Sequence, residues 1–167
     1  MKILLTGSSG FLGTALTQRL GDSYEFHHLA SDLKDHKQVE QEVLKANPDL
    51  IIHLAARTEV QESFVEQIEF SQINYVGTVN LIESAMKLPN LKNFLFSSTM
   101  ETYGWQPISD EVRDHGVPDT FISFNEDTPT NPNCPYAVAK VGCENYLKYV
   151  HRSFDFPFVA IRQTNTY

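Results

Sequence analysis

The stretch Lys2-Ile3-Leu4-Leu5-Thr6-Gly7-Ser8-Ser9-Gly10-Phe11-Leu12-Gly13 decides the fold. A short apolar run ends in a turn signal, and apolar residues then recur at helical spacing up to Leu20. The glycines therefore lie between a strand and a helix. They permit a tight turn and a close approach of the backbone to a pyrophosphate, while the helix N-terminus offers unpaired N–H groups. The pattern predicts a phosphate-binding loop; taken alone, it also fits an ordinary strand-to-helix turn.

The rest of the chain alternates between strand and helix patterns. Two of the helices stop before buried apolar runs, one at Asn47-Pro48-Asp49 and one at Pro89-Asn90. We expect an α/β fold, a Rossmann-type doubly wound parallel sheet with helices on both faces, as one domain over residues 1–167. The strands are expected near 2–6, 24–29, 50–54, 93–97 and 157–162, and the helices near 11–20, 36–46, 64–87 and 136–153.

Composition limits the partners. The 167 residues are 41% hydrophobic and carry a net charge of −8, from 13 basic and 21 acidic residues, which argues against a nucleic-acid surface. No apolar run is long enough for a membrane span, and the N-terminus enters a strand without a secretory signal, so we expect a cytoplasmic protein with no membrane partner. Cys134 and Cys143 are expected to be reduced thiols, and no spacing of His and Cys suggests a metal.

Tyr136-Ala-Val-Ala-Lys140 carries the chemistry. Helical residues four apart share a face, so the phenol and the ammonium can point into one cleft. A free tyrosine has a pKa near ~10, and a nearby cation favours the phenolate, so we expect Lys140 to lower the pKa of Tyr136. Tyr136 could then take a proton from an alcohol. A hydroxyl-rich strand end, Ser97-Ser98-Thr99, precedes this helix.

With these motifs the chain resembles the NAD-dependent epimerase/dehydratase family, which comprises extended short-chain dehydrogenases/reductases that act on nucleotide sugars. Five groups of motifs occur in the family's order: Thr6 to Gly13; Asp32-Leu33; His53-Leu-Ala-Ala56; Asn74-Tyr-Val-Gly-Thr78; and a reaction centre made of Phe96-Ser-Ser-Thr99, Tyr103-Gly104, Tyr136 to Lys140 and Arg162-Gln-Thr-Asn165. The resemblance covers residues 2 to 167.

The resemblance implies a role for each matching residue. Thr99 would bond the sugar hydroxyl, Tyr136 would be the base, and Lys140 would bind the nicotinamide ribose and lower the tyrosine pKa. The implied step is hydride transfer from a sugar carbon to NAD, with NADP not excluded. Asn165 would contact the substrate, and Asn74 would steady the site. The cofactor-binding set is Gly7, Ser9, Gly10, Phe11, Leu12, Gly13, Asp32, Leu33, Leu54, Ala55, Ala56, Asn74, Ser97, Tyr136 and Lys140.

Two parts of this site keep alternatives. The small side chains of Ala55 and Ala56 fit a close dinucleotide or tight core packing. Asp32-Leu33 matches the family's adenine-contacting pair, but the acid that would hold the ribose diol, and so favour NAD, is not evident between His27 and Ser31. Either Asp32 serves the ribose or other groups decide. His27 and the next histidine are interpreted as strand residues, because nothing completes a metal set.

Glu101 separates possible reactions. In an extended segment it would lie on the same side as Thr99, and the family's dehydratases and decarboxylases resemble this chain in having Thr-x-Glu-x-Tyr-Gly. A carboxylate beside a carbonyl can remove an acidified C–H proton. Met100 stands where one dehydratase group has an Asp, which weakens that particular prediction. The alternative is a Glu paired with a surface cation.

Family enzymes are roughly twice this length, so we expect a C-terminal substrate-binding part to be absent from this chain. The leading hypothesis is an NAD(P)-dependent nucleotide-sugar epimerase or dehydratase, active in full-length form. A carbonyl or keto-sugar reductase and a non-catalytic dinucleotide-binding module are the alternatives. Residues 105–135 form a long loop, either near the substrate or a surface insertion.

The resemblance also implies a homodimer through the helices near 64–87 and 136–153. Their apolar positions serve equally well as core. They are Phe64, Ile68, Ile73, Leu81, Val138, Tyr146 and Val150.

Overall fold

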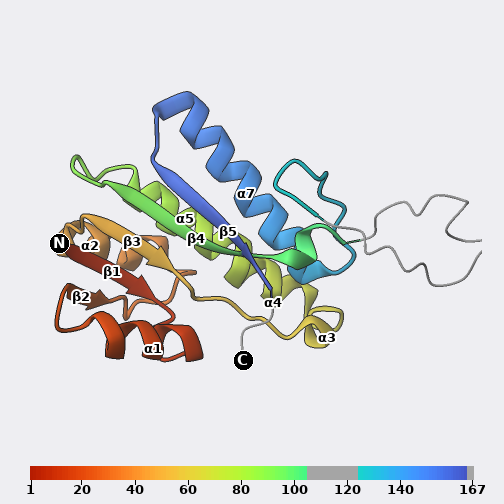
Figure 1. The fold of residues 1–167 in the computed structure, drawn as a ribbon, viewed down its shortest axis with the longest axis horizontal. Coiled ribbons are helices and arrows are strands. Elements are labelled where there is room, and N and C mark those ends of the chain that lie inside the picture. The colour runs from red at the N-terminus through yellow and green to blue at the C-terminus, as the bar shows by residue number, and fades with distance from the viewer. Residues whose placement is uncertain (105–123, 165–167) are drawn as a thin grey trace, which may run out of the picture.

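The computed structural model describes residues 1–104 and 124–164. Its centre is one parallel sheet with the strand order β2-β1-β3-β4-β5. All five arrows point the same way in Figure 1, so the loops that follow the strands gather at one edge. The strands are β1 (Lys2–Thr6), β2 (Glu25–His28), β3 (Leu50–His53), β4 (Asn93–Thr99) and β5 (Phe158–Gln163). The predicted parallel α/β sheet is confirmed, with strand ends within two residues of those expected.

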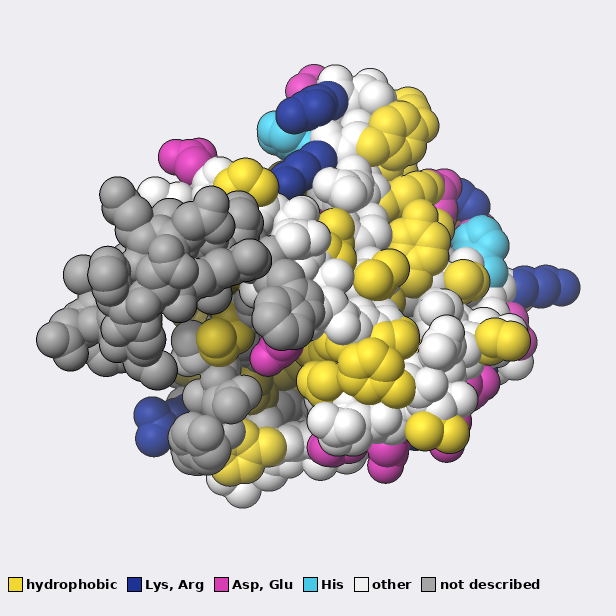
Figure 2. Space-filling model, turned by 90° about the vertical axis from the view of Figure 1, so that its right-hand side faces the viewer, with side chains coloured by type: hydrophobic (Ala, Val, Ile, Leu, Met, Phe, Trp, Pro, Cys, Tyr) yellow, Lys and Arg dark blue, Asp and Glu magenta, His cyan; other side chains and the backbone are white. Residues whose placement is uncertain are grey.

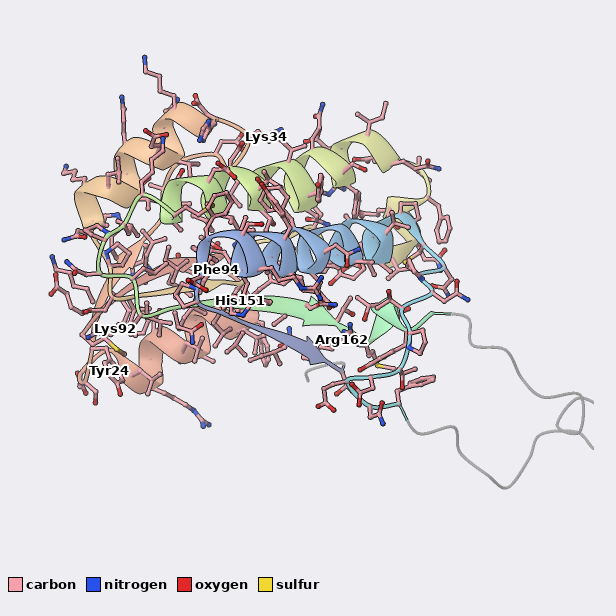
Figure 3. All side chains as sticks on the ribbon, turned by 90° about the horizontal axis from the view of Figure 1, so that it is seen from above. Tyr24, Lys34, Lys92, Phe94, His151 and Arg162 are labelled. Carbon is pink, nitrogen blue, oxygen red and sulfur yellow. The ribbon has the colours of Figure 1, made fainter. Side chains whose placement is uncertain are left out.

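Helices cover the two faces of the sheet unequally. Helix α1 (Phe11–Leu20) packs through Leu16 against Ile3, Leu5 and Ile52 on one face. Three helices cover the other face: α2 (His36–Ala46), α5 (Gly77–Ala85) and α7 (Pro135–Phe154). Their apolar stripes bury the larger core, in which Phe94 and Phe96 of β4 are fully enclosed. Figure 3 shows α7 and α5 side by side over the strands.

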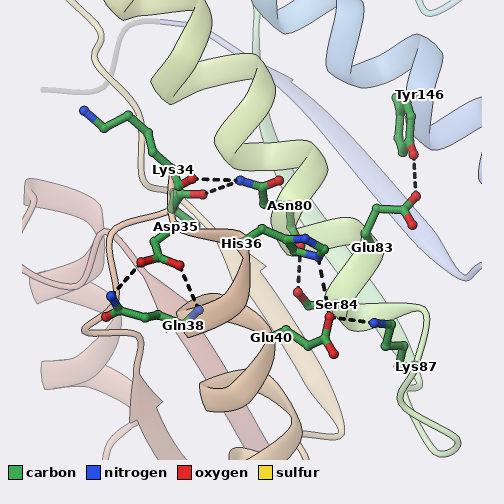
Figure 4. A network of polar contacts seen from close by, with 11 residues as sticks. Lys34, Asp35, His36, Gln38, Glu40, Asn80, Glu83, Ser84, Lys87 and Tyr146 are labelled. Atoms are coloured by element: carbon green, nitrogen blue, oxygen red, sulfur yellow. Dashed lines mark hydrogen bonds and ion pairs between the residues drawn. The ribbon is translucent and has the colours of Figure 1, made fainter.

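Polar contacts join these three helices along their outer sides. The Asn80 amide on α5 donates to the Leu33 carbonyl at 2.9 Å, before α2 begins. Lys87 donates to Glu40 of α2, and the Tyr146 hydroxyl of α7 donates to Glu83 of α5, as Figure 4 shows. These contacts connect α5 to α2 on one side and to α7, which carries Tyr136 and Lys140, on the other.

The helix predicted over 64–87 is wrong as a single regular element. The structure has α3 (Val60–Ser63), a turn, α4 (Gln67–Ser71), the π-helical segment η1 (Gln72–Val76) and then α5. The cause lies at Asn74 in η1. Its carbonyl accepts hydrogen bonds from the Thr78 hydroxyl and the Cys143 thiol, and its side chain turns back to Arg57. Such π turns often mark functional positions.

Part of the sheet face that carries α1 is open. On β5, Val159 and Ile161 are nearly half exposed, whereas Phe158 and Ala160 pack into the larger core. Strand β5 pairs only with β4 among the described strands and forms an edge of the sheet.

Within residues 1–104 and 124–164, no helix has the length and apolar character needed to cross a membrane.

The strand order fixes where a ligand can bind. Strands β1 and β3 are neighbours, but the chain leaves β1 towards α1 on one face and the later helices lie on the other face. At such a switch point the loops separate at the carboxyl edge of the sheet and leave a crevice. The glycine-rich loop follows β1, and therefore it forms one wall of that crevice.

Candidate active site

One cavity of about 680 Å³ lies at the carboxyl edge and brings most of the predicted site residues together. Figure 2 looks onto this side of the molecule, where apolar side chains gather between polar ones. The cavity is lined by the loop after β1 with the start of α1, the loop after β3, and the end of β4 with the start of α7; single residues of α3 and η1, Glu101 and the end of β5 complete it. The predicted residues in its lining are Gly7, Ser9, Gly10, Phe11, Leu12, Gly13, Leu54, Ala55, Ala56, Ser97, Thr99, Glu101, Tyr136 and Lys140.

Glycine is required at two positions of the first wall. Gly7 has φ +70°, and a Cβ there would lie 2.7 Å from the Ala55 nitrogen in the loop after β3. A Cβ on Gly13 would lie 2.2 Å from the Gly7 carbonyl oxygen. Both contacts are backbone contacts that cannot yield, so the strand, loop and helix pack closely only because these side chains are absent.

This wall fits a dinucleotide phosphate. Gly10 caps α1 without a side-chain hydrogen bond to the first turn, so the helix N-terminus keeps N–H groups that an anion can accept. Ala55 and Ala56 add little bulk on the opposite wall. A glycine cradle, an uncapped helix end and small facing residues are what close binding of a pyrophosphate needs.

The reaction end is built on the last residues of β4. Thr99 is buried and caps η2 (Met100–Thr102), a 3-10 helix, by accepting a bond from the Glu101 N–H at 3.2 Å. The sequence analysis expected Glu101 to follow Thr99 in an extended segment. That expectation is wrong, because this cap turns the chain into η2. The turn still places Glu101 in the lining of the same cavity as Thr99 and Tyr136.

The helix that carries Tyr136 starts beside this turn. Pro135 occupies the first turn of α7, and the Cys134 sulfur accepts a hydrogen bond from the Ala137 N–H at 3.4 Å. Tyr136 is 8% exposed and Lys140 is 3% exposed, so both point inward from one helix face. Burial raises the pKa of Tyr136, and a hydrogen bond with the Thr99 side chain opposes this.

Burial and the charges of Cys134 and Glu101 outweigh the Thr99 hydrogen bond and raise the pKa of Tyr136, so a lowering of this pKa by Lys140 stays a prediction. The Lys140 ammonium donates to the Ser97 carbonyl at 2.7 Å and lies 4.8 Å from the Phe96 ring centre, but 5.8 Å from that of Tyr136. Burial lowers the pKa of Lys140 itself to about 8. Four-residue spacing gives a common face, but the tertiary packing decides what the ammonium bonds.

A buried charge network missed in the sequence supports the reaction end. Glu144, one turn after Lys140, accepts bonds from the Ser98 hydroxyl at 2.6 Å and from Arg162 of β5 at 2.7 Å. The guanidinium also lies 4.8 Å from the Tyr103 ring centre. Although burial opposes it, bonding to Arg162 and Ser98 holds the pKa of Glu144 below its usual range. Sequence spacing shows Glu144 on the Tyr136 face, but not its partner.

The adenosine end contains a second residue that the sequence did not indicate. Glu42 of α2 accepts hydrogen bonds from the N–H groups of Ala30 and Ser31 at 3.0 and 2.9 Å, and from the Ser31 hydroxyl at 2.6 Å. Burial alone would raise the pKa of Glu42, but these bonds lower it to about 2. A charged carboxylate thus shapes the loop after β2, next to the exposed Asp32.

Some predicted site residues lie away from the cavity. Leu33 is buried in the larger core, where its Cβ would be 2.8 Å from a Cβ on Gly77. Asn74 is also buried; its amide holds the Arg57 backbone through two bonds of 2.9 and 2.8 Å and so supports the cavity wall from behind. Asn165 and residues 105–123 of the long loop fall outside the part of the chain that the structure describes.

The described end of that loop returns to the reaction end. Phe124 stacks on Tyr103 with ring centres 4.9 Å apart, and the Tyr103 hydroxyl donates to the Asn125 carbonyl at 3.0 Å. Gly104 has φ +49°, and a Cβ there would lie 1.9 Å from the Asn131 carbonyl oxygen. The segment before α7 is thus packed against the turn that carries Glu101.

The sequence pattern of the NAD dependent epimerase/dehydratase family matches residues 3–167. The chain belongs to the NAD-dependent epimerase/dehydratase family. The predicted family is therefore confirmed.

Individual relatives match nearly the whole chain, in sequence or in fold. A dTDP-D-glucose 4,6-dehydratase from Dictyostelium discoideum is 31% identical over 99% of this chain and 44% of its own length. RMD from Pseudomonas aeruginosa, solved in complex with NADPH, is 25% identical with a TM-score of 0.80, over 98% of this chain and 54% of that one. A Thermus thermophilus UDP-glucose 4-epimerase solved with NAD shares the fold, with a TM-score of 0.82 at 24% identity over 97% of this chain and 54% of that one. The chain spans about half the length of the curated relatives it matches.

Proposed function

We propose that the full-length protein is an NAD(P)-dependent nucleotide-sugar epimerase or dehydratase that oxidises a sugar hydroxyl with Tyr136 as base. One observation carries the proposal: the glycine cradle and the Thr99, Tyr136 and Lys140 side chains line a single cavity. A bound dinucleotide supplies the hydride acceptor. Relatives that bind NAD or NADPH, and others that act on sugar nucleotides, support the cofactor and substrate class.

The chain's own residues would handle the proton. Thr99 accepts and donates beside the phenol, so it can align a sugar hydroxyl towards Tyr136. Because burial raises the pKa of Tyr136, the phenol needs a cation nearby before it can act as base at neutral pH. Among the described residues, two cations line the cavity, Arg57 and Lys140. Arg57 is paired with two glutamates, whereas Lys140 shares a helix face with Tyr136. The Ser97 bond holds Lys140 where a ribose hydroxyl could bind.

Glu101 favours a dehydratase within this class. Its carboxylate lines the cavity on the Thr99 side and is close enough to Tyr136 for its charge to raise the pKa of the phenol. A base in this place suits removal of a C–H proton beside a keto group, which an elimination requires and a simple epimerisation does not. The surface ion-pair alternative has no support among the described contacts of Glu101.

Turnover by the full-length protein tests the proposal. Purified protein is incubated with UDP-glucose or dTDP-glucose and NAD, and the sugar product is identified by mass spectrometry. Loss of water from the sugar, absent in Glu101→Gln, supports a dehydratase, whereas an unchanged mass with altered stereochemistry supports an epimerase. In a separate incubation of a keto-sugar nucleotide with NADH or NADPH, stoichiometric release of oxidised cofactor would mark a reductase. Binding without any turnover of these or other sugar nucleotides would leave the non-catalytic module.

We also propose a homodimer through α4 and α7, which pack against each other. Of the predicted interface residues, Leu81 and Val150 are fully buried core, but Ile68 is 75% exposed and Val138 56% exposed. Light scattering on Ile68→Glu against the unchanged protein tests this: the variant is expected to be monomeric.

We also propose a cytoplasmic location, since Cys134 and Cys143 are free thiols.

A further inference from the structure

The buried His53 lies between the two loops of the cofactor cavity and takes no part in the proposed chemistry. It ends β3 and is 1% exposed. Its Nδ1 lies 2.6 Å from the Thr6 hydroxyl at the end of β1, and its Nε2 lies 2.8 Å from the Thr78 hydroxyl on α5. The side chain therefore spans from the strand before the glycine loop to the helix behind the cavity.

Hydrogen-bond counting fixes the direction of the bond between His53 and Thr78. The Thr78 hydroxyl has one proton and donates it to the Asn74 carbonyl at 2.6 Å, an atom that cannot donate. Thr78 must therefore accept from His53, so the ring carries its proton on Nε2. Burial, with the positive charge of Lys140 adding to it, lowers the pKa of His53 to about 3, so the ring is neutral and Nδ1 accepts.

The bonds continue into the cavity wall. Because Nδ1 accepts, the Thr6 hydroxyl donates to it, and a lone pair on Thr6 is left for the Ala55 N–H at 3.1 Å. Ala55 is the residue against which Gly7 packs. At the other end, Asn74 holds the Arg57 backbone through its side-chain amide. The bonds thus run from the Ala55 N–H through Thr6, His53 and Thr78 to the Asn74 carbonyl. Since the Asn74 side chain holds Arg57, both ends of the segment 55–57 are connected to the strand that precedes the glycine loop.

We infer that His53, as the Nε2–H tautomer, is a positioning residue that sets the spacing between the glycine loop and residues 55–57 for the dinucleotide phosphates. The inference rests on the proposed function for the identity of the ligand, but not for the hydrogen bonds. Gly7 and Ala55 are so close that not even a methyl group fits between them. A shift of either loop therefore changes the width of the crevice between them.

Nitrogen NMR of histidine-labelled protein tests the tautomer. His53→Asn identifies the signals, because it removes them. The expected result is a protonated Nε2 and an unprotonated Nδ1 for His53 at neutral pH. A proton on Nδ1, or a ring protonated on both nitrogens, would overturn the inference.

Matched variants of Thr78 test the positioning, since Thr78 does not line the cavity. Thr78→Ser keeps the hydroxyl, and Thr78→Val removes it. Thr78→Val leaves the buried Nε2–H of His53 unpaired, so we expect it to weaken binding of NAD or NADP by about tenfold and to raise the exchange rate of the Ala55 amide by a similar factor. Thr78→Ser should restore both values to within about twofold.

The two readouts separate this inference from the proposed function. Thermal unfolding first shows that Thr78→Val and Thr78→Ser are both folded. If the two variants then bind the dinucleotide equally and exchange the Ala55 amide at equal rates, the positioning role is refuted. If the unchanged protein bound neither dinucleotide, the proposed function would fail, and the Ala55 amide exchange would still decide the role of His53.

Discussion

The two ends of the cavity are built on different principles. The phosphate end is made of backbone, with Gly7 and Gly13 admitting contacts that any Cβ would block, and with a neutral histidine behind it. The reaction end is made of side chains, in which a lysine and a glutamate are buried beside a tyrosine. The first end is determined by shape and the second by charge. Substitutions should therefore affect binding at one end and catalysis or stability at the other.

The largest effect is expected at the reaction end from Tyr136→Phe. Removing the phenolic hydroxyl removes the base, and turnover by the full-length protein should fall by about 10³-fold. Dinucleotide affinity should change by less than about threefold, because the phosphate contacts lie at the other end. Steady-state kinetics and a binding titration on the same sample measure both. Unchanged turnover would mean that another group is the base.

The buried pair behind the reaction end comes next. Glu144→Gln leaves the Arg162 guanidinium without its carboxylate, and we expect the free energy of unfolding to fall by about 3 kcal/mol. Urea unfolding measures it. Glu69→Gln is the matched control: it breaks the exposed pair with Lys34, which water screens, and should therefore cost far less. Similar losses in the two variants would contradict the role given to burial.

At the phosphate end, Gly13→Ala should weaken dinucleotide binding by about 100-fold. The added methyl would lie 2.2 Å from the Gly7 carbonyl oxygen. Gly10→Ala meets the same oxygen at 3.3 Å and should lose far less. Calorimetric titration compares them after thermal unfolding has shown that both are folded. A greater loss in Gly10→Ala would show that the close packing of Gly13 is not what shapes this end.

The smallest expected effect is at the phosphate end, where His53 makes the stability of the protein depend on pH. The pKa of His53 is about 3 when folded, against an ordinary value of 6.5, so between these values the unfolded chain binds a proton that the folded chain does not. Stability is therefore lost as pH falls below 6.5, by up to about 1.4 kcal/mol per unit. The difference in unfolding free energy between the unchanged protein and His53→Gln, measured at pH 7, 6 and 5, should shrink accordingly. A constant difference would contradict the neutral buried ring.

Much of this architecture could be predicted from sequence because parallel strands are buried on both faces. Runs such as Leu50-Ile51-Ile52 have few other interpretations, and Pro and Gly mark their ends. The glycine loop and the spacing of Tyr136 and Lys140 are likewise local signals. Each describes what neighbouring residues do to one another, and the structure brings them into the same cavity.

The failures share a different cause. The π turn at Asn74, the burial of Leu33 and the bond from Lys140 to Ser97 all depend on residues more than 40 positions away, or on a helix packed from elsewhere. Glu42 and His53 were missed as supporting residues because tertiary packing, and not their sequence neighbours, supplies their partners. A histidine at the end of an apolar run gives no sign in sequence that threonines 47 and 25 positions away will enclose it.

Strand β5 has a consequence for handling the protein. Among the described strands it pairs only with β4, so its other edge carries backbone groups that can pair with a further strand, and Val159 and Ile161 give that edge an apolar flank. Whatever part of the molecule or neighbouring copy supplies such a strand would extend the sheet. Concentrated samples in which this edge is bare should aggregate by strand addition, so solubility will depend on what covers β5 more than on the net charge of −8.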